Sequence, residues 1–277
     1  MARILVFDSG VGGLSILRVL QHNQATQSEH HQWLFCSDNA FFPYGLKKEA
    51  ELIARVTNVL SALQEKFQPD IIVLACNTAS TVALESVRAT LSTPVIGVVP
   101  AIKPAAQLSQ SQSIGLLATP GTISRPYTQK LIDEFAADCR ITRVGSNELV
   151  WIAEQYLRTG MVDNMELHRI LAPLRDAIAH HKLDTVVLAC THFPLLIEFL
   201  HEQLPEIKHW VDSGEAIARR VAWCLNQRET VPPPADIVPP NIALFTRLDD
   251  NIKALERALS YFDIRETQVL DLPPISQ

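Results

Sequence analysis

Short apolar runs alternate along the chain with longer stretches in which apolar residues recur every three to four positions. The short runs are rich in valine, isoleucine and leucine and predict buried parallel strands, whereas the longer stretches predict amphipathic helices. Strands are predicted at 4–7, 33–36, 71–75, 95–98, 114–118, 185–189, 208–211 and 242–246. Helices are predicted at 13–22, 47–66, 79–90, 101–108, 121–136, 147–159, 165–181, 194–203, 214–227 and 249–262. The alternation predicts an α/β fold of mostly parallel sheets flanked by helices.

Two segments 114 residues apart are near-copies of each other. Residues 71–78 read IIVLACNT and residues 185–192 read TVVLACTH, so Cys76 and Cys190 occupy equivalent positions. The first strands of the two halves repeat as well, because RILVFDSGVGG at 3–13 resembles SIGLLATPGT at 113–122. We therefore expect two pseudo-symmetric domains, each with one cysteine at the C-terminal end of a strand. In open α/β sheets that edge is where ligands bind.

The domain boundary is expected within 97–104, after the first half has finished its own strands. The proline-rich stretch VPPPADIVPP at 231–240 predicts a stiff connector, because proline fits neither a helix interior nor a central strand. Residues 208–277 are expected to return to the first half and complete its sheet. The expected division is 1–97 with 208–277 for a discontinuous first domain, and 98–207 for the second.

Composition and charge bear on three questions: whether the protein binds nucleic acid, whether it enters a membrane, and in which cellular compartment it works. The net charge is −6 and no dense Lys/Arg run occurs, so a nucleic-acid surface is not expected. No apolar run approaches the roughly 18 residues of a membrane span, and the chain enters its first strand without room for a signal peptide. Five cysteines at unequal spacings are more typical of reduced thiols than of a disulfide framework. We expect a cytoplasmic protein. Its oligomeric state is left open, and a homodimer is one possibility.

Cys76 and Cys190 are the first candidates for chemistry. A single cysteine after a strand is more often a small buried hydrophobe. These two, however, are repeated and each is followed by polar residues that begin a helix, where a thiol pKa is lowered. Both are therefore predicted to be reactive, whereas Cys36, Cys139 and Cys224 lack this context and are predicted to be structural.

Polar residues near the same strand ends form the rest of the candidate site. Asp8 begins the turn DSGVGG after the first strand, where it could orient a thiol or bind an ammonium group; an ordinary strand–helix turn is the alternative. His192 could activate Cys190 or simply cap a helix. No Lys or Arg occurs in 8–17, 76–87 or 190–200, so neutral donors are expected to hold an anionic substrate. These donors are Ser9, Asn77, Thr78 and Thr191. No phosphate-loop, pyridoxal-phosphate or metal-ligand pattern occurs, and the chemistry is expected to need no cofactor or metal.

Seven segments, in order, resemble the cofactor-independent glutamate racemases of bacterial cell-wall synthesis. They are FDSGVGGLSILR (7–18), FFPYG (41–45), LACNTAS (74–80), PVIGVVPAIKPA (94–105), ATPGT (118–122), LACTHFPLL (188–196) and VDSGEAIARRV (211–221). The paired Cys-Asn-Thr and Cys-Thr-His turns are the most specific part of the resemblance. It implies a two-domain α/β enzyme that interconverts L- and D-glutamate in a cleft between its halves and supplies D-glutamate for peptidoglycan.

The resemblance also implies roles for individual residues. Cys76 and Cys190 would act as base and acid and exchange roles with the hand of the substrate. Asp8 would assist Cys76, and His192, supported by Glu154, would assist Cys190. The residues that it implies in substrate binding are Asp8, Ser9, Tyr44, Gly45, Asn77, Thr78, Thr119, Thr122, Thr191 and His192.

Three other functions fit parts of the sequence. An aspartate racemase or a broad acidic amino-acid racemase would share the fold and both cysteines. A dithiol redox protein would use a reversible Cys76–Cys190 disulfide, although the chain has no C-x-x-C motif. A binding module of the periplasmic-receptor type would hold an amino acid without turnover, but such a module requires an export signal.

Overall fold

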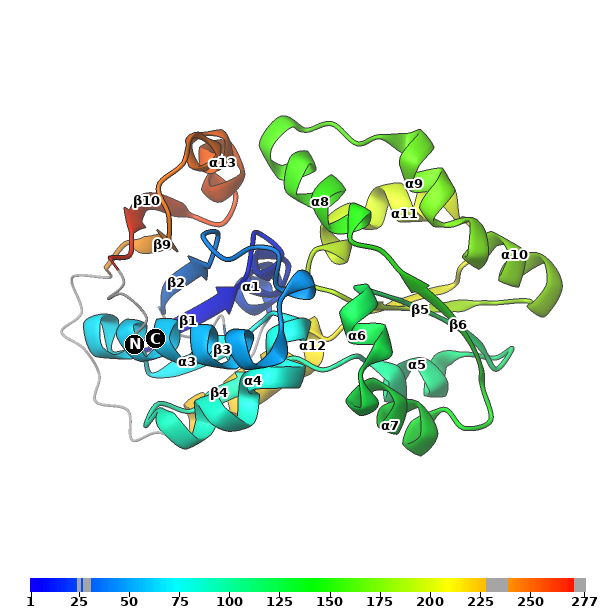
Figure 1. Ribbon diagram of the computed structural model, residues 1–277, viewed down its shortest axis with the longest axis horizontal. Coiled ribbons are helices and arrows are strands. Elements are labelled where there is room, and N and C mark those ends of the chain that lie inside the picture. Colours follow the sequence, from blue (N-terminus) through cyan, green and yellow to red (C-terminus); the bar gives the residue numbers. More distant parts are fainter. Residues whose placement is uncertain (24–25, 27–30, 228–238, 272–277) are drawn as a thin grey trace. The chain divides into compact units, whose positions relative to one another are not determined.

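The computed structural model describes residues 1–23, 26, 31–227 and 239–271, and these form two compact units. The first unit comprises Met1–Val98 and Gly214–Gln277, and the second comprises Val99–Ser213. Each unit is built on one parallel sheet with helices packed against it (Figure 1), which confirms the predicted fold class. Most of the proline-rich connector, 231–238, lies outside the described residues.

The sheet of the first unit has its strands in the order β10-β9-β2-β1-β3-β4, and every described pair is parallel. The strands are β1 (Arg3–Asp8), β2 (Gln32–Ser37), β3 (Ile71–Leu74), β4 (Val95–Gly97), β9 (Asn241–Phe245) and β10 (Ile264–Val269). The helices are α1 (Gly13–His22), η1 (Tyr44–Leu46), α3 (Glu49–Phe67), α4 (Asn77–Thr90), α12 (Gly214–Asn226) and α13 (Asp250–Ser260). Asp8 is in register with Ser37, so β1 and β2 end at the same edge.

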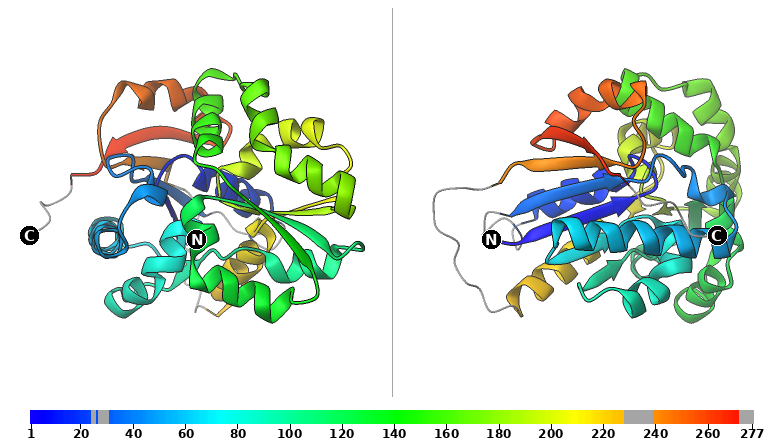
Figure 2. Two further views of the ribbon diagram at one scale, coloured as in Figure 1. Left: turned by 45° about the vertical axis from the view of Figure 1, so that its right-hand side comes forward. Right: turned by 60° about the vertical axis from the view of Figure 1, so that its left-hand side comes forward.

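The core of the first unit explains why its central strands are apolar without interruption. Leu5 and Phe7 of β1 belong to a buried cluster with the inner faces of α3 and α4, two helices that lie side by side (Figure 2). Ile4 and Val6 point to the opposite face and are just as completely buried. Because both faces are covered, the central strands show no alternation of apolar and polar residues.

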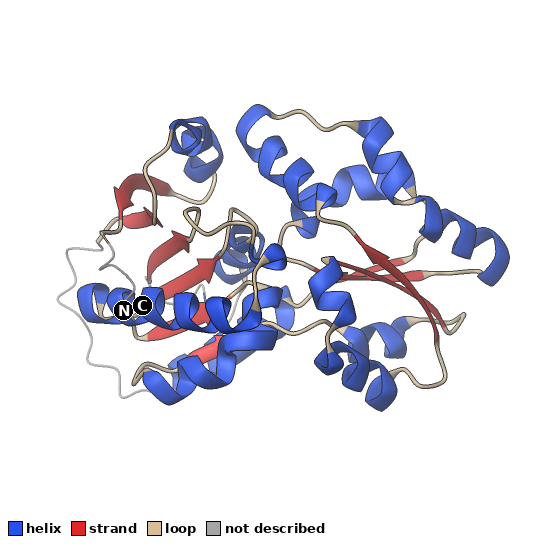
Figure 3. Cartoon of the chain, viewed as in Figure 1, coloured by secondary structure: helices blue, strands red, loops and turns tan. Residues whose placement is uncertain are grey.

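The second unit has a smaller sheet, in the order β6-β5-β7-β8, and its strands are also parallel (Figure 3). Its strands are β5 (Ser113–Ala118), β6 (Arg140–Gly145), β7 (Thr185–Ala189) and β8 (His209–Val211). Its helices are α5 (Ile102–Leu108), α6 (Pro120–Ser124), α7 (Pro126–Phe135), α8 (Glu148–Thr159), α9 (Asn164–Ile170), α10 (Ala172–His181), η2 (Phe193–Leu196) and α11 (Ile197–Gln203). β5 and β7 are the central strands, and Ala118 is in register with Ala189.

Two strands, β6 and β10, are missing from the sequence-based prediction. Both are edge strands, with the sequences RITRVG and IRETQV, and most of their side chains are exposed or half-buried. An edge strand with a solvated face carries charged residues, so neither segment contains the apolar run by which the other strands were recognised.

Other differences concern boundaries. The predicted strand at 208–211 is β8, which pairs with β7; residues 208–213 therefore belong to the second unit and not, as expected, to the first. The helices predicted at 121–136 and 165–181 are each divided in two. α7 begins at Pro126, and α10 has Pro173 in its first turn, where proline is tolerated because the first amides of a helix need no partner.

Asp184 joins the α5–β5 loop to the start of β7. Its carboxylate accepts hydrogen bonds from the Ser109 and Thr185 hydroxyls and from the N–H groups of Gln110 and Ser111. Burial alone would raise the pKa of Asp184, but these bonds outweigh it and lower the pKa from 3.8 to about 2. The resulting stabilisation is fully present above about pH 4 and is lost as the pH falls towards 2.

We expect Asp184→Asn to lower the free energy of unfolding at neutral pH by about 2–3 kcal/mol, because an amide cannot accept all four bonds. Urea denaturation followed by circular dichroism measures the change. Asp176→Asn is the control, because its side chain is 72% exposed and should change stability little. A loss no larger than that of the control would contradict this role of Asp184.

Candidate active site

The first cluster of candidate residues lies where β1 and β3 end. The Asp8 side chain is fully buried, and its Oδ1 accepts from the Gly10 N–H at 3.1 Å and from the Ser9 hydroxyl at 3.2 Å. The Ser9 Oγ also lies 3.8 Å from the Cys76 Sγ, within hydrogen-bonding distance for sulfur. Ser9 therefore links the Asp8 carboxylate to the thiol.

The local backbone brings these groups together. β1 continues into α1 through a tight turn, and a Cβ at Gly13 would approach the Cβ of Asp8 to 2.9 Å and the Phe35 ring to 3.2 Å. Only glycine fits so close to Asp8. Cys76 occupies the N-cap position of α4, and Asn77 and Thr78 are its first residues.

Asn77 has an unused acceptor. The residue is 4% exposed, and its Oδ1 is buried without a hydrogen-bond partner among the described residues. A buried amide oxygen without a partner is costly, which favours a role in accepting a hydrogen bond from a ligand.

Asp38 is a further buried carboxylate at this edge, and it is not among the site residues predicted from the sequence. It follows β2 and accepts from the Tyr44 hydroxyl at 2.7 Å, from Arg55 at 2.6 and 2.9 Å, and from the Thr246 hydroxyl at 2.6 Å. The rule that identified Asp8, a carboxylate directly after a buried strand, also applies to Asp38.

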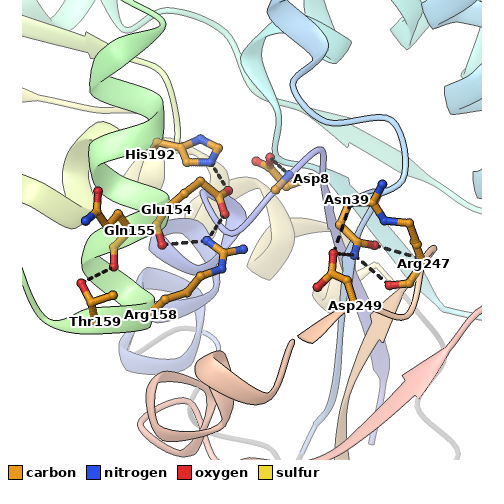
Figure 4. A network of polar contacts seen from close by, with 10 residues as sticks. Asp8, Asn39, Glu154, Gln155, Arg158, Thr159, His192, Arg247 and Asp249 are labelled. Carbon is orange, nitrogen blue, oxygen red and sulfur yellow. Dashed lines mark hydrogen bonds and ion pairs between the residues drawn. The ribbon is translucent and has the colours of Figure 1, made fainter. Parts of the chain in front are cut away.

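Tyr44 is held by this network. Burial and the Asp38 charge raise the pKa of Tyr44 well above its usual value, so the hydroxyl remains a neutral donor to Asp38. The neighbouring Asn39 exchanges two hydrogen bonds with the backbone of Arg247 (Figure 4). The Tyr44 side chain therefore fixes its loop, and Gly45, beside it in η1, is partly exposed.

The second cluster begins where β7 ends. The Cys190 Sγ lies 3.8 Å from the His192 Nδ1, and the His192 Nε2 lies 2.8 Å from the Glu154 Oε1. Glu154 is on α8, which packs against η2 just after His192, and its other oxygen binds Arg158 (Figure 4). Cys190, His192 and Glu154 are all almost fully buried.

Electrostatics favour a charged His192. Burial alone would lower the pKa of His192, but hydrogen bonding and charge attraction from Cys190 and Glu154 outweigh burial and raise it well above the usual value. An imidazolium beside a sulfur stabilises the thiolate, which is the reactive form of cysteine.

Three threonines complete this edge. Thr119 follows β5, accepts from the N–H of Thr122 as the N-cap of α6, and donates its hydroxyl proton to the Thr122 hydroxyl at 3.0 Å. Ala118 and Ala189 are in register, so Thr119 and Cys190 follow neighbouring strands. Thr191, between Cys190 and His192, is buried as well.

Within the ranges that the structure describes, no group of three or more His, Cys, Asp and Glu side chains could hold a metal ion.

The same ranges contain no helix that is both long and apolar enough to cross a membrane.

Comparison with known proteins gives consistent matches. Residues 4–221 match the family described as Asp/Glu/hydantoin racemase. The glutamate racemase of Shewanella loihica is 53% identical over 220 residues, which are 79% of this chain and 80% of that protein. The glutamate racemase of Actinobacillus pleuropneumoniae serotype 5b is 40% identical over 268 residues, which are 97% and 98% of the two chains.

Solved structures agree with the sequence matches. The glutamate racemase of Escherichia coli, crystallised with L-glutamate and the activator UDP-MurNAc-ala, superposes with a TM-score of 0.89 at 43% identity. That match covers 98% of this chain and 99% of the other. A glutamate racemase of Bacillus anthracis gives a TM-score of 0.79 at 25% identity, over 98% of both chains. Because the family match extends across both cysteine turns, the chain belongs to the Asp/Glu/hydantoin racemase family.

Proposed function

We propose that this protein is a glutamate racemase that interconverts L- and D-glutamate by a two-cysteine mechanism without a cofactor. One observation carries the proposal: the two repeated turns each hold a buried thiol beside groups that can exchange protons with it. For Cys76 these are Ser9 and Asp8, and for Cys190 they are His192 and Glu154. The relatives named glutamate racemases, and the L-glutamate in the E. coli structure, support glutamate as the substrate.

The proposed reaction transfers one proton in each direction. A thiolate on one face of the substrate takes the Cα proton, and the electron pair is delocalised into the neighbouring carboxylate. A thiol on the other face then donates its proton to Cα, giving the opposite hand and leaving a thiolate there. Cys76 takes the proton from D-glutamate and Cys190 takes it from L-glutamate. Each positioned acid or base of this kind contributes about 10²- to 10⁴-fold.

Neutral groups and a carboxylate are proposed to hold the substrate. Asp8 and the unpaired Asn77 Oδ1 can accept hydrogen bonds from the ammonium group. Hydroxyls and helix N-termini can donate to the two carboxylates and stabilise the charge that develops on one of them. The residues proposed for these contacts are Ser9, Tyr44, Gly45, Thr78, Thr119, Thr122, Thr191 and His192.

Incubation of D-glutamate with the protein in deuterated water tests the proposal. Circular dichroism should show L-glutamate forming, and NMR should show deuterium at Cα of the product. In a two-base reaction the new hydrogen comes from the thiol on the opposite face, which has exchanged with solvent. Early in the reaction the product should therefore be deuterated while the remaining D-glutamate keeps its protium.

The same assay, run on D-aspartate, separates the other functions. Equal turnover of both amino acids would make the protein a broad acidic amino-acid racemase. Binding without any Cα exchange would make it a binding module and would overturn the proposal. Product that retains the original proton would exclude the two-base mechanism, because one group would then be serving both faces.

We further propose that the D-glutamate enters peptidoglycan and that the enzyme works in the cytoplasm. None of the five cysteines forms a disulfide, in keeping with a reducing compartment. Expression in a bacterial strain that needs added D-glutamate should restore its growth without the supplement. Failure of the active protein to do so would separate racemase activity from the cell-wall role.

A further inference from the structure

Arg158 makes an unusual ion pair one helical turn after Glu154. Its Nη1 donates to the Glu154 Oε2 at 2.5 Å and to the Glu154 backbone oxygen at 2.7 Å. The side chain is only 20% exposed, and its Nε is buried without a hydrogen-bond partner among the described residues. Figure 4 shows the Glu154 carboxylate between Arg158 and His192.

A second Arg–Glu pair in the same unit shows the more usual arrangement. Arg169 binds Glu166 through both Nε and Nη2, at 2.9 and 2.5 Å, and its side chain is 65% exposed. Two parallel bonds are the best geometry for an isolated Arg–carboxylate pair. Among the described residues, Arg158 makes no second bond to the Glu154 carboxylate, whose other oxygen lies 2.8 Å from the His192 Nε2. An arginine that is more buried yet less well paired is not explained by stability alone.

We propose that Arg158 is a positioning residue for racemisation: it keeps Glu154 ionised, so that His192 stays protonated and supports the thiolate of Cys190. The inference rests on the proposed function, because it assigns Arg158 a part in making Cys190 a base. Arg158 acts through Glu154 and His192, whose contacts form a continuous chain to the sulfur.

The proton positions explain why the charge of Glu154 matters. A doubly protonated His192 directs its Nε2–H to Glu154 and its Nδ1–H to the sulfur of Cys190. If Glu154 took up a proton, the imidazolium would lose its counter-charge and pass its Nδ1 proton to the thiolate. Cys190 could then no longer act as a base. A cation on the second oxygen makes protonation of Glu154 harder, so it extends the active form to lower pH.

Other ionisable groups lie on α8 itself and on α11. On α8, Glu148 accepts from the Ser146 hydroxyl, and the Tyr156 ring packs edge-on against Phe199. η2, which packs against α8, carries no ionisable side chain. The ionisable residues of α11, which supplies Phe199, are Glu198, His201 and Glu202.

The test compares Arg158→Gln with Arg158→Lys and with the control Arg169→Gln. Initial rates on L-glutamate, from about pH 5 to about pH 9, give kcat/KM for each variant. In Arg158→Gln, the acidic side of the kcat/KM profile should shift to higher pH by about one pH unit. On that side kcat/KM should fall about tenfold, and at alkaline pH it should fall little. Lysine should restore the acidic side in part, because it restores the charge. Arg169→Gln should keep the wild-type profile.

An NMR titration of the His192 imidazole gives a readout that does not depend on turnover. In Arg158→Gln, Glu154 should take up its proton at a higher pH than in the wild type. The NMR signals of the neighbouring His192 ring should therefore change at that higher pH. A uniform loss of rate at every pH, with an unchanged titration, would make Arg158 merely structural and overturn the inference, as would an unchanged profile. If the wild type racemises no glutamate, the proposed function fails, and the titration still shows whether Arg158 keeps Glu154 ionised.

Discussion

Cys76→Ala and Cys190→Ala are each expected to lower racemisation by at least about 1,000-fold, because each removes the only proposed acid or base on one face of the substrate. The loss should appear in both directions, since each thiol is the base in one direction and the acid in the other. Circular dichroism on L- and D-glutamate measures both rates. Deuterium exchange at Cα, run in parallel, shows whether either face still reacts.

Cys224→Ala is the matched control, because Cys224 is a half-buried free thiol on α12 outside both clusters. It should retain the wild-type rate. Removing one small side chain should leave the fold intact in all three variants, and thermal melting checks this. An alanine variant at 76 or 190 with near-wild-type racemisation would rule out the two-cysteine mechanism.

Arg55→Met is expected to lower the free energy of unfolding by about 3–5 kcal/mol, because it leaves the Asp38 carboxylate buried without its cation. Asp38 is 0% exposed, and Arg55 supplies two of its four side-chain hydrogen bonds. Adding Asp38→Asn should recover part of the loss, since the unpaired charge is then gone. Urea denaturation of both variants measures the two effects.

Arg169→Met provides the comparison for this prediction. Its ion pair with Glu166 is largely exposed, and exposed pairs contribute little to stability. If Arg55→Met cost no more than Arg169→Met, the Asp38–Arg55 pair would not be the anchor of the loop that carries Tyr44.

The sequence predicted the centre of each sheet better than its edges. β1, β3, β5 and β7 are buried on both faces and therefore consist of apolar runs that can be recognised directly. Most side chains of β6 and β10 are exposed or half-buried, and their charged residues conceal the strand. The two proline-divided helices were missed for a different reason: proline is compatible with the first turn of a new helix, so apolar periodicity continues across the break.

The candidate site was predicted unevenly for similar reasons. Cys76, Cys190 and Asp8 stand directly after strands, so local pattern was enough to select them. Asp38 obeys the same rule but belongs to no repeat. The contact between His192 and Glu154 joins residues 38 positions apart, and it depends on how α8 packs near η2. No local pattern encodes that packing, and Glu154 was expected only from the resemblance.

The hydrogen bond between Asp38 and Thr246 bears on the order in which the two units can fold during synthesis. The two residues are 208 positions apart, and the uninterrupted second unit is translated between them. At about 5–20 residues per second, a ribosome makes Thr246 about 10–40 s after Asp38. The second unit can fold within that interval, but the first cannot complete its sheet, because β9 and β10 have not yet been made. During synthesis, the second unit can therefore complete its sheet before the first unit does.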